Sequence, residues 1–430
     1  MFSRSSWRPT LPRLALTASA LVALSACAAG AGSSSAPVAT QAAAATSGAT
    51  SRLLSPAVAA DPATARDPGA ASATATTKGL PSAGATSAGR TASKEQAATA
   101  VSTPGAAAAG AVYGFSDPNL VNESASVQLQ QLEQMKAMGV TSIRLDAGWA
   151  WVEPTAGSYD WSALDQVISS INQVGFSIDL IIDQCPSWAG VSSADGSVWA
   201  QPASAATYAT YAAAVAARYG SKGVKYFEIW NEPNINNFWV PTPDPAAYTA
   251  DLQAAYSAIK QVDPSATVIS GGLSPATTTA TTIDPRTFLE DMYSDGAEGS
   301  FDGLGDHPYS YPLLPDDEES WSGWSQMSQT SPSLRSIMAA NGDSSKKIWI
   351  TEFGAPTTGS NSVGEDGQAA ALTQAIAQAQ SFSWLGSFYI YTWADLASEP
   401  EIDNGFGLLT DSNTEKTAYA AVSAALSSGQ

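Results

Sequence analysis

From about residue 111 onward, short apolar runs alternate with amphipathic stretches. Eight runs rich in β-branched and aromatic residues have the length of a buried strand. They cover residues 112–115, 141–146, 176–183, 224–231, 267–270, 301–308, 347–352 and 387–393. The clearest helical period lies between the second and third runs, where apolar residues recur at spacings of three and four until Gly175 ends the pattern.

Further segments with helical character separate the other runs. We expect helices at 124–138, 208–219, 333–340, 369–380 and 417–426, and two more that open at Asp244-Pro245 and Asp284-Pro285. Eight strands separated by helices over about 320 residues predict an α/β fold, one (β/α)₈ TIM barrel. The alternative is an open doubly wound sheet, but such a sheet usually has a glycine-rich phosphate turn after its first strand, and none is found here.

Two of the predicted strands end in a glutamate that a chain-breaking residue follows closely. The first is Phe-Glu-Ile-Trp-Asn-Glu-Pro-Asn at 227–234, and the second is Ile-Trp-Ile-Thr-Glu-Phe-Gly at 348–354. A carboxylate at the tip of a buried parallel strand is costly unless it has a task, and in a barrel the chemistry lies at these tips. We therefore predict that Glu232 and Glu352 form a paired-carboxylate site; the alternative is two unrelated glutamates on the surface.

The N-terminal residues have the pattern of an export signal. Arg4, Arg8 and Arg13 precede the apolar stretch 14–26, which predicts a signal peptide over residues 1–26. The stretch ends in Leu-Ser-Ala-Cys, which resembles the lipobox of bacterial lipoproteins, so Cys27 would carry the lipid. We expect an exported lipoprotein anchored at the cell surface or in the periplasm. The alternative is an ordinary cleavage site with an incidental cysteine, and thus a secreted protein.

Residues 27–110 contain almost only Ala, Ser, Thr, Gly and Pro, without apolar periodicity. Such a segment buries too little apolar surface to offset the entropy of ordering, so we predict a disordered, flexible tether. The folded domain is then 111–430.

Charge and composition exclude several classes of function. The predicted domain has 11 Lys and Arg against 36 Asp and Glu, a net charge of −25, which argues against nucleic acid as a partner. Cys185 is its one cysteine and His307 its one histidine, so an intradomain disulfide and a histidine-rich metal site are excluded. We expect a monomer that uses no metal and no other cofactor.

The strand-end motifs resemble those of the retaining glycoside hydrolases of clan A. The resemblance covers about 111–428 and rests on five places, namely 227–234, Thr351-Glu352-Phe353-Gly354, His307-Pro308-Tyr309, Tyr391-Thr392-Trp393 and Arg144. The segments 144–161 and 405–419 look nearest to family 39, with family 5 as the neighbour. Family 5 enzymes usually carry a histidine near the tip of strand three, where this chain has Ile-Asp-Gln-Cys at 182–185, so a simple cellulase is less favoured.

The resemblance implies a role for each catalytic residue. Glu232 would be the acid/base, and Glu352 would be the nucleophile of a double displacement. Asn231 would bind the sugar 2-hydroxyl, and Tyr309 would donate a hydrogen bond to Glu352. Arg144 lies in an apolar strand and needs a partner.

The partner of Arg144 is Glu352 by resemblance or Glu228 by strand alternation, which also places Trp230 on the inner face. His307 would be a hydrogen-bonding group of the same cleft, and Trp393 would form the floor of the central sugar site, because pyranose C–H faces pack on indole.

Several tryptophans follow the strand ends and suggest an extended groove for a sugar chain. These are Trp149, Trp151, Trp188, Trp239, Trp321 and Trp324. The sequence thus predicts a retaining β-glycosidase that acts within a polysaccharide. The alternatives are a catalytically silent carbohydrate-binding barrel, a structural lipoprotein that only displays a domain, and a transglycosylase whose acceptor is a sugar.

Overall fold

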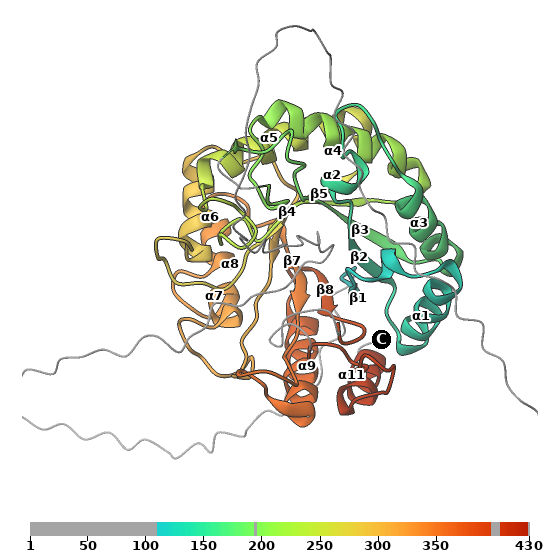
Figure 1. The fold of residues 1–430 in the computed structure, drawn as a ribbon. Helices are drawn as coiled ribbons and strands as arrows, with labels where there is room; N and C mark the ends of the chain where they lie inside the picture. The colour runs from blue at the N-terminus through green and yellow to red at the C-terminus, as the bar shows by residue number, and fades with distance from the viewer. Residues whose placement is uncertain (1–109, 193–195, 397–404, 429–430) are drawn as a thin grey trace, which may run out of the picture. The chain divides into compact units, whose positions relative to one another are not determined.

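Each of the eight apolar runs forms a parallel strand in the computed structural model, which describes residues 110–192, 196–396 and 405–428. The strands are β1 Val112–Ser116, β2 Ser142–Asp146, β3 Ser177–Ile182, β4 Tyr226–Asn231, β5 Thr267–Gly272, β6 Gly303–Asp306, β7 Lys347–Phe353 and β8 Leu385–Tyr391. Each strand pairs with the next, and β8 pairs with β1 from Val112–Ser387 to Ser116–Tyr391. The barrel is therefore closed, which confirms the predicted (β/α)₈ fold and excludes the open sheet (Figure 1).

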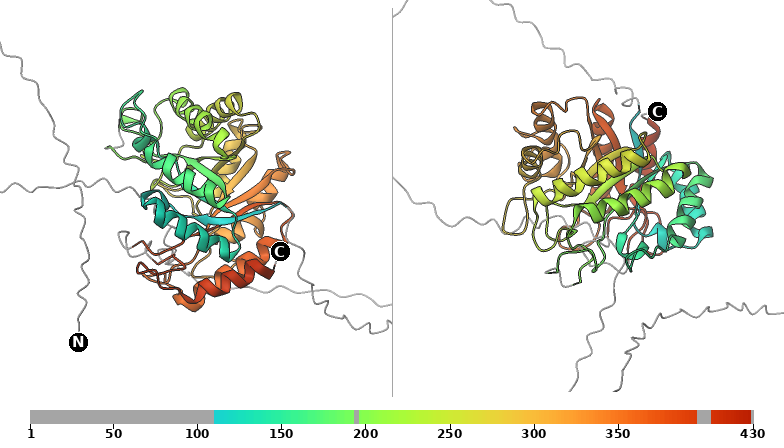
Figure 2. Two further views of the ribbon diagram at one scale, coloured as in Figure 1. Left: turned by 90° about the vertical axis from the view of Figure 1, so that its right-hand side faces the viewer. Right: turned by 90° about the horizontal axis from the view of Figure 1, so that it is seen from above.

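Helices surround the barrel on its outer side (Figures 1 and 2). The longer ones are α1 Ala125–Met138, α3 Ser162–Val174, α4 Ala205–Tyr219, α5 Pro245–Val262, α6 Pro285–Ser294, α8 Leu334–Ala340, α9 Gly364–Ser381 and α11 Thr417–Ser428. The side chains of Asp244 and Asp284 accept backbone N–H bonds in the first turns of α5 and α6, as their Asp-Pro sequences predict. The short helices α2, Trp149–Val152, and α7, Gly323–Ser328, were not predicted because one or two turns show no clear period.

Large aromatic side chains fill the barrel interior at the N-terminal end of the strands, which we call the lower layer. Trp349 of β7 lies 4.8 Å from the ring of Tyr226, and it occupies space left by Gly303 and Gly386. A Cβ atom on either glycine would come within 2.4–2.5 Å of the Trp349 indole. Because this layer is closed, the chemistry has to lie at the opposite, C-terminal end of the strands.

Strand β4 departs from regular alternation one residue before its end. Trp230 has a φ of 71°, and the pairing with β5 passes from Ile229 to Asn231. The Trp230 indole donates to the Phe238 carbonyl at 2.6 Å and packs against Trp239 on the outer side. The expectation that Trp230 faces inward is wrong. The left-handed backbone at Trp230 interrupts the alternation, so Glu228 and Asn231 both lie on the inner face although they are three positions apart.

The predicted signal peptide, the tether and Cys27 lie outside the described residues. Within the described ranges, no helix combines the length and the apolar character that a membrane crossing needs.

Candidate active site

Arg144 of β2 is the centre of the polar network at the C-terminal end of the barrel. Its buried guanidinium donates to Glu228 through Nε at 2.6 Å and through Nη2 at 3.2 Å. It also donates to Glu352 Oε1 at 2.5 Å, to Asn231 Oδ1 at 2.9 Å and to Ser116 Oγ at 2.9 Å. Burial acts to lower the pKa of Arg144, but the charges of Glu228 and Glu352 outweigh it and raise that pKa well above its usual value. The cation therefore stays charged.

Both alternatives for the partner of Arg144 are thus realised at once. Glu228 accepts further bonds from the backbone N–H of Gly272 at 2.9 Å and from Thr351 Oγ1 at 3.1 Å. A buried carboxylate with this many donors is a fixed structural anion, which holds the guanidinium in one orientation.

Glu352 is held at both of its carboxyl oxygens. Oε1 accepts from Arg144, and Oε2 accepts from the Tyr309 hydroxyl at 2.8 Å. Burial raises the pKa of Glu352 above its ordinary value, while Arg144 and Tyr309 act in the opposite direction. Burial and the adjacent Glu352 raise the pKa of Tyr309 well above 10, so the phenol keeps its proton and acts as a donor.

Glu232 directly follows β4 and faces Glu352 across the barrel mouth. It is fully buried and has a φ of 43°, and its backbone N–H donates to the Gly272 carbonyl at 3.0 Å. Its Oε1 lies 2.8 Å from His307 Nδ1. The positive φ at a non-glycine residue is uncommon and turns the side chain toward the site.

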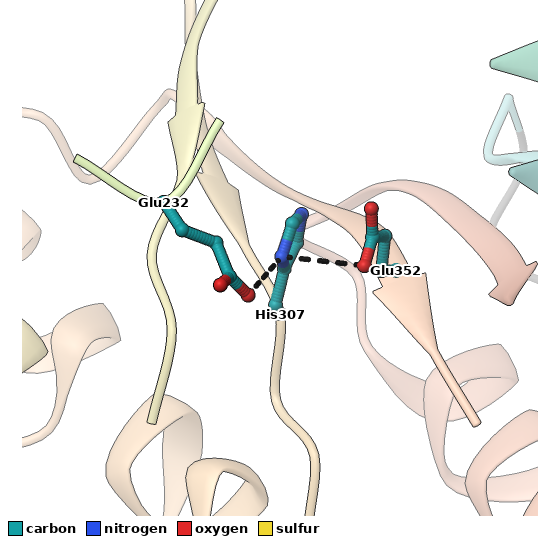
Figure 3. Close-up of side chains that lie close together, drawn as sticks. All are labelled: Glu232, His307 and Glu352. Carbon is teal, nitrogen blue, oxygen red and sulfur yellow. Dashed lines mark hydrogen bonds and ion pairs between the residues drawn. The ribbon is translucent and has the colours of Figure 1, made fainter. Parts of the chain in front are cut away.

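His307 lies between the two glutamates (Figure 3). Its Nδ1 is 2.8 Å from Glu232 Oε1 and 3.6 Å from Glu352 Oε2, and its Nε2 is 3.5 Å from Arg144 Nη2. Burial and the Arg144 charge hold the pKa of His307 well below 6.5, so the imidazole is neutral. Since arginine can only donate, Nε2 is the acceptor, and Nδ1 carries the proton toward the glutamates.

The two candidate catalytic carboxylates are close to each other. One oxygen of Glu232, one oxygen of Glu352 and one nitrogen of His307 all lie within 4.8 Å of one another. This spacing would also allow a metal ion, but the Arg144 cation is bound to the same Glu352 carboxylate. Repulsion from that cation disfavours a divalent ion. The two carboxyl groups instead suit acid, base and nucleophilic chemistry on an organic substrate that lies between them.

Comparisons with known proteins assign the chain to a family. The model of the cellulase family, glycosyl hydrolase family 5, matches residues 104–389. The chain belongs to this family. It is therefore a glycoside hydrolase with a clan A fold, as the motifs predicted, and the matching model is that of the family expected as the neighbour.

Solved structures of three glycoside hydrolases show the same fold. One is a family 39 glycoside hydrolase from Bacteroides cellulosilyticus WH2, at 24% identity and a TM-score of 0.58, aligned over 75% of this chain and 64% of that one. A monomeric β-xylosidase from Caulobacter crescentus CB15 aligns at 20% identity with a TM-score of 0.55, over 73% and 67% of the two chains. Xylanase 10B from Thermotoga petrophila RKU-1, in complex with xylobiose, aligns at 14% identity with a TM-score of 0.53, over 74% and 94%.

This chain thus spans less than two thirds of the family 39 enzyme. Among curated proteins, no match to the sequence is found.

Four tryptophans expected at the sugar site or along its groove are buried between strands and helices, namely Trp149, Trp239, Trp324 and Trp393. Trp239 is fully buried and packs edge-on against Trp230 and Tyr248, in the layer between β4 and α5. Trp393 packs against Phe115 and Tyr419, in the layer outside β1 and β8. Neither ring can serve as the predicted sugar platform, because both are enclosed by the layer between strands and helices.

The sequence did not single out a group of polar residues that complete the network. Ser116 Oγ accepts a hydrogen bond from Arg144, and Thr351 Oγ1 donates one to Glu228. Asp146 ends β2, and burial raises its pKa to about 7, with Arg144 acting in the opposite direction. Their position at or near strand ends is the signal that could have identified them.

Proposed function

We propose that this glycoside hydrolase is a retaining β-glycosidase that cleaves a polysaccharide by double displacement. The observation that carries the proposal is the separation of the two carboxylates, whose nearest oxygens lie within 4.8 Å. Retaining enzymes hold their carboxyl groups about 5–5.5 Å apart, whereas inverting enzymes need about 6.5–9.5 Å to admit a water between them.

The charges around the pair support a division of roles. Arg144 and Tyr309 donate to Glu352, and such donors favour the ionised form that a nucleophile needs. Glu232 faces the neutral imidazole of His307, whose Nδ1 lies 2.8 Å from Glu232 Oε1. This environment suits a group that gives and takes a proton.

In the first step, Glu232 protonates the leaving oxygen while Glu352 attacks the anomeric carbon and forms a glycosyl-enzyme. In the second step, Glu232 removes a proton from water, and the water displaces Glu352 with a second inversion. Asn231 has its Oδ1 engaged by Arg144, which orients its amide N–H groups toward a sugar 2-hydroxyl. That contact strengthens in the transition state.

Cleavage within a chain is supported by partly exposed tryptophans that follow the strand ends. Trp188 is 38% exposed, and Trp151, Trp199 and Trp321 are half-buried. Exposed indole faces suit sugar rings beyond the cleaved bond. The β-xylosidase and the xylanase among the similar structures make β-xylosides a first choice of substrate.

Glutamine variants of the two glutamates test the assignment on 2,4-dinitrophenyl β-glycosides of glucose, xylose, mannose and N-acetylglucosamine. Glu352→Gln should abolish turnover of every substrate. Glu232→Gln should still form the glycosyl-enzyme, because this leaving group needs little protonation, and then stall until azide releases a β-glycosyl azide.

Glu153→Gln is the matched control, because Glu153 is also buried but bonds Trp149 away from the site. An α-glycosyl azide from Glu352→Gln, with Glu232→Gln dead, would reverse the roles. Undiminished hydrolysis by both variants would show that neither glutamate is catalytic. No turnover of any substrate by the wild type would leave the barrel as a binding protein, and sugar transfer that outpaces hydrolysis would make it a transglycosylase.

A further inference from the structure

Asp146, the last residue of β2, lies at the active-site mouth and takes no part in the two displacement steps. It is two residues beyond Arg144 on the same strand, so both side chains lie on the inner face of the barrel. The charges of Arg144, Glu228 and Glu352 all act on its carboxyl group. Asp146 therefore stands beside the nucleophile, at the rim where the sugar has to bind.

Within the described residues, the carboxyl group of Asp146 accepts no hydrogen bond. The two glutamates beside it are both engaged, because Glu228 and Glu352 each accept from Arg144 and from a second donor. Asp146 is nevertheless as accessible as the nucleophile, since each residue is 3% exposed. Buried polar groups are nearly always hydrogen-bonded, so the open acceptor at the mouth points to a donor on the ligand.

Asp183, just beyond the neighbouring strand β3, is an acid of a different kind (Figure 1). It is fully buried, and protein covers both of its carboxyl oxygens. Burial and the charge of Asp146 raise the pKa of Asp183 well above 3.8, which favours its neutral, protonated form. Asp146 is therefore the acid of these two strand ends that can meet a sugar.

We propose that Asp146 is a specificity-determining residue that accepts a hydrogen bond from the 3- or 4-hydroxyl of the sugar attached to Glu352 in the glycosyl-enzyme. This assignment rests on the proposed function. The 2-hydroxyl is taken by Asn231 on β4, so an acid on β2 meets one of the remaining ring hydroxyls. A carboxylate has two acceptor oxygens and no donor, which suits hydroxyl groups. The negative charges of Glu228 and Glu352 in the same mouth disfavour an anionic sugar.

The proposed contact depends on pH. Burial raises the pKa of Asp146 to about 7, with Arg144 acting in the opposite direction. A hydroxyl binds the ionised carboxylate more strongly than the neutral acid, so the preference for a sugar that has this hydroxyl should grow as the pH rises through about 7. The charged and titratable groups around Asp146 are Arg144 on its own strand, Glu228 on β4, Glu352 on β7 and Asp183 after β3. Their own titration affects a sugar and its deoxy analogue alike, so it cancels in the ratio of the two rates.

The test compares full-length Asp146→Asn with the wild type. The substrates are the 2,4-dinitrophenyl β-glycoside that the wild type hydrolyses fastest and its 2-, 3- and 4-deoxy analogues. Loss of a hydrogen bond to a charged group should lower kcat/KM on the parent glycoside about 10- to 100-fold. On the 3-deoxy or the 4-deoxy analogue the loss should shrink to about threefold or less, because the partner is already missing. On the 2-deoxy analogue the full loss should remain.

Asp183→Asn is the matched control, because it makes the same change in a covered acid at the next strand end. It should keep the wild-type ratios among the four substrates. A second measurement needs no variant: in the wild type, the ratio of kcat/KM for the parent to that for the affected analogue should rise about tenfold between pH 5 and pH 9.

Equal losses on all four substrates, the same pattern in Asp183→Asn, or a wild-type ratio that does not change with pH would each overturn the assignment of Asp146. Hydrolysis of the parent glycoside would continue in all of these cases, and the proposed function would stand. A wild-type protein that hydrolyses none of the glycosides would overturn the proposed function, and the assignment of Asp146 with it.

Discussion

Replacing Tyr309 with phenylalanine should make Glu352 harder to ionise. The hydroxyl donates to Glu352 Oε2 at 2.8 Å, and both side chains are buried. A buried hydrogen bond to a charged group contributes about 1.5–3 kcal/mol, and one pKa unit corresponds to 1.36 kcal/mol. Burial already raises the pKa of Glu352, and the hydroxyl opposes that rise, so its removal should raise the pKa further by about 1–2 units.

The assay is the pH dependence of kcat/KM on a 2,4-dinitrophenyl β-glycoside. This leaving group departs without protonation, so the acidic limb reports the ionisation of the nucleophile and not that of Glu232. Because activity needs ionised Glu352, it is lost as the pH falls through the pKa of that residue. In Tyr309→Phe the acidic limb should therefore move to higher pH.

Tyr389→Phe is the control, since it removes a buried hydroxyl bonded to Ser142 at 2.8 Å in the lower barrel layer. Its acidic limb should match the wild type. A Tyr309→Phe limb that stays within about 0.3 units of the wild type would refute the reasoning, however much the rate falls.

Three further changes test other parts of the account. Asn231→Ala should lower kcat/KM about 10²–10³-fold on a substrate with a 2-hydroxyl and far less on its 2-deoxy analogue, measured by steady-state kinetics. Lys416→Met should destabilise the fold by about 3 kcal/mol in urea unfolding, because it leaves the Asp395 carboxylate, 2.7 Å from Lys416 Nζ and largely buried, without its cation. Cys27→Ser should release the protein from the membrane fraction if Cys27 carries several acyl chains; unchanged fractionation would remove the proposed anchor.

The barrel was predictable because its signals are local. Apolar runs of strand length recur eight times with helical segments between them, and the Asp-Pro pairs at 244–245 and 284–285 mark helix starts that the structure bears out. The proximity of Glu232 and Glu352 followed from strand ends meeting at one rim of a closed barrel. The two possible partners of Arg144 could also be named from sequence, although only the structure shows that both are used.

The directions of single side chains near strand ends were not predictable. Alternation placed Trp230 inside, but its left-handed backbone turns the ring outward. Trp393 follows β8, and its position against Phe115 and Tyr419 depends on packing between distant segments. No local pattern reports such a backbone change, so a tryptophan after a strand can equally be a core residue or a sugar platform.

The most direct test of double displacement is the anomeric configuration of the first product. ¹H NMR during early hydrolysis of a β-glycoside distinguishes the two anomers before mutarotation mixes them. Glu232 and Glu352 lie too close together to admit a water between them and the sugar, so Glu352 attacks the anomeric carbon itself. We therefore predict that the β-anomer forms first and converts slowly to the equilibrium mixture. Initial release of the α-anomer would mean single displacement by water and would contradict the assignment of Glu352 as nucleophile.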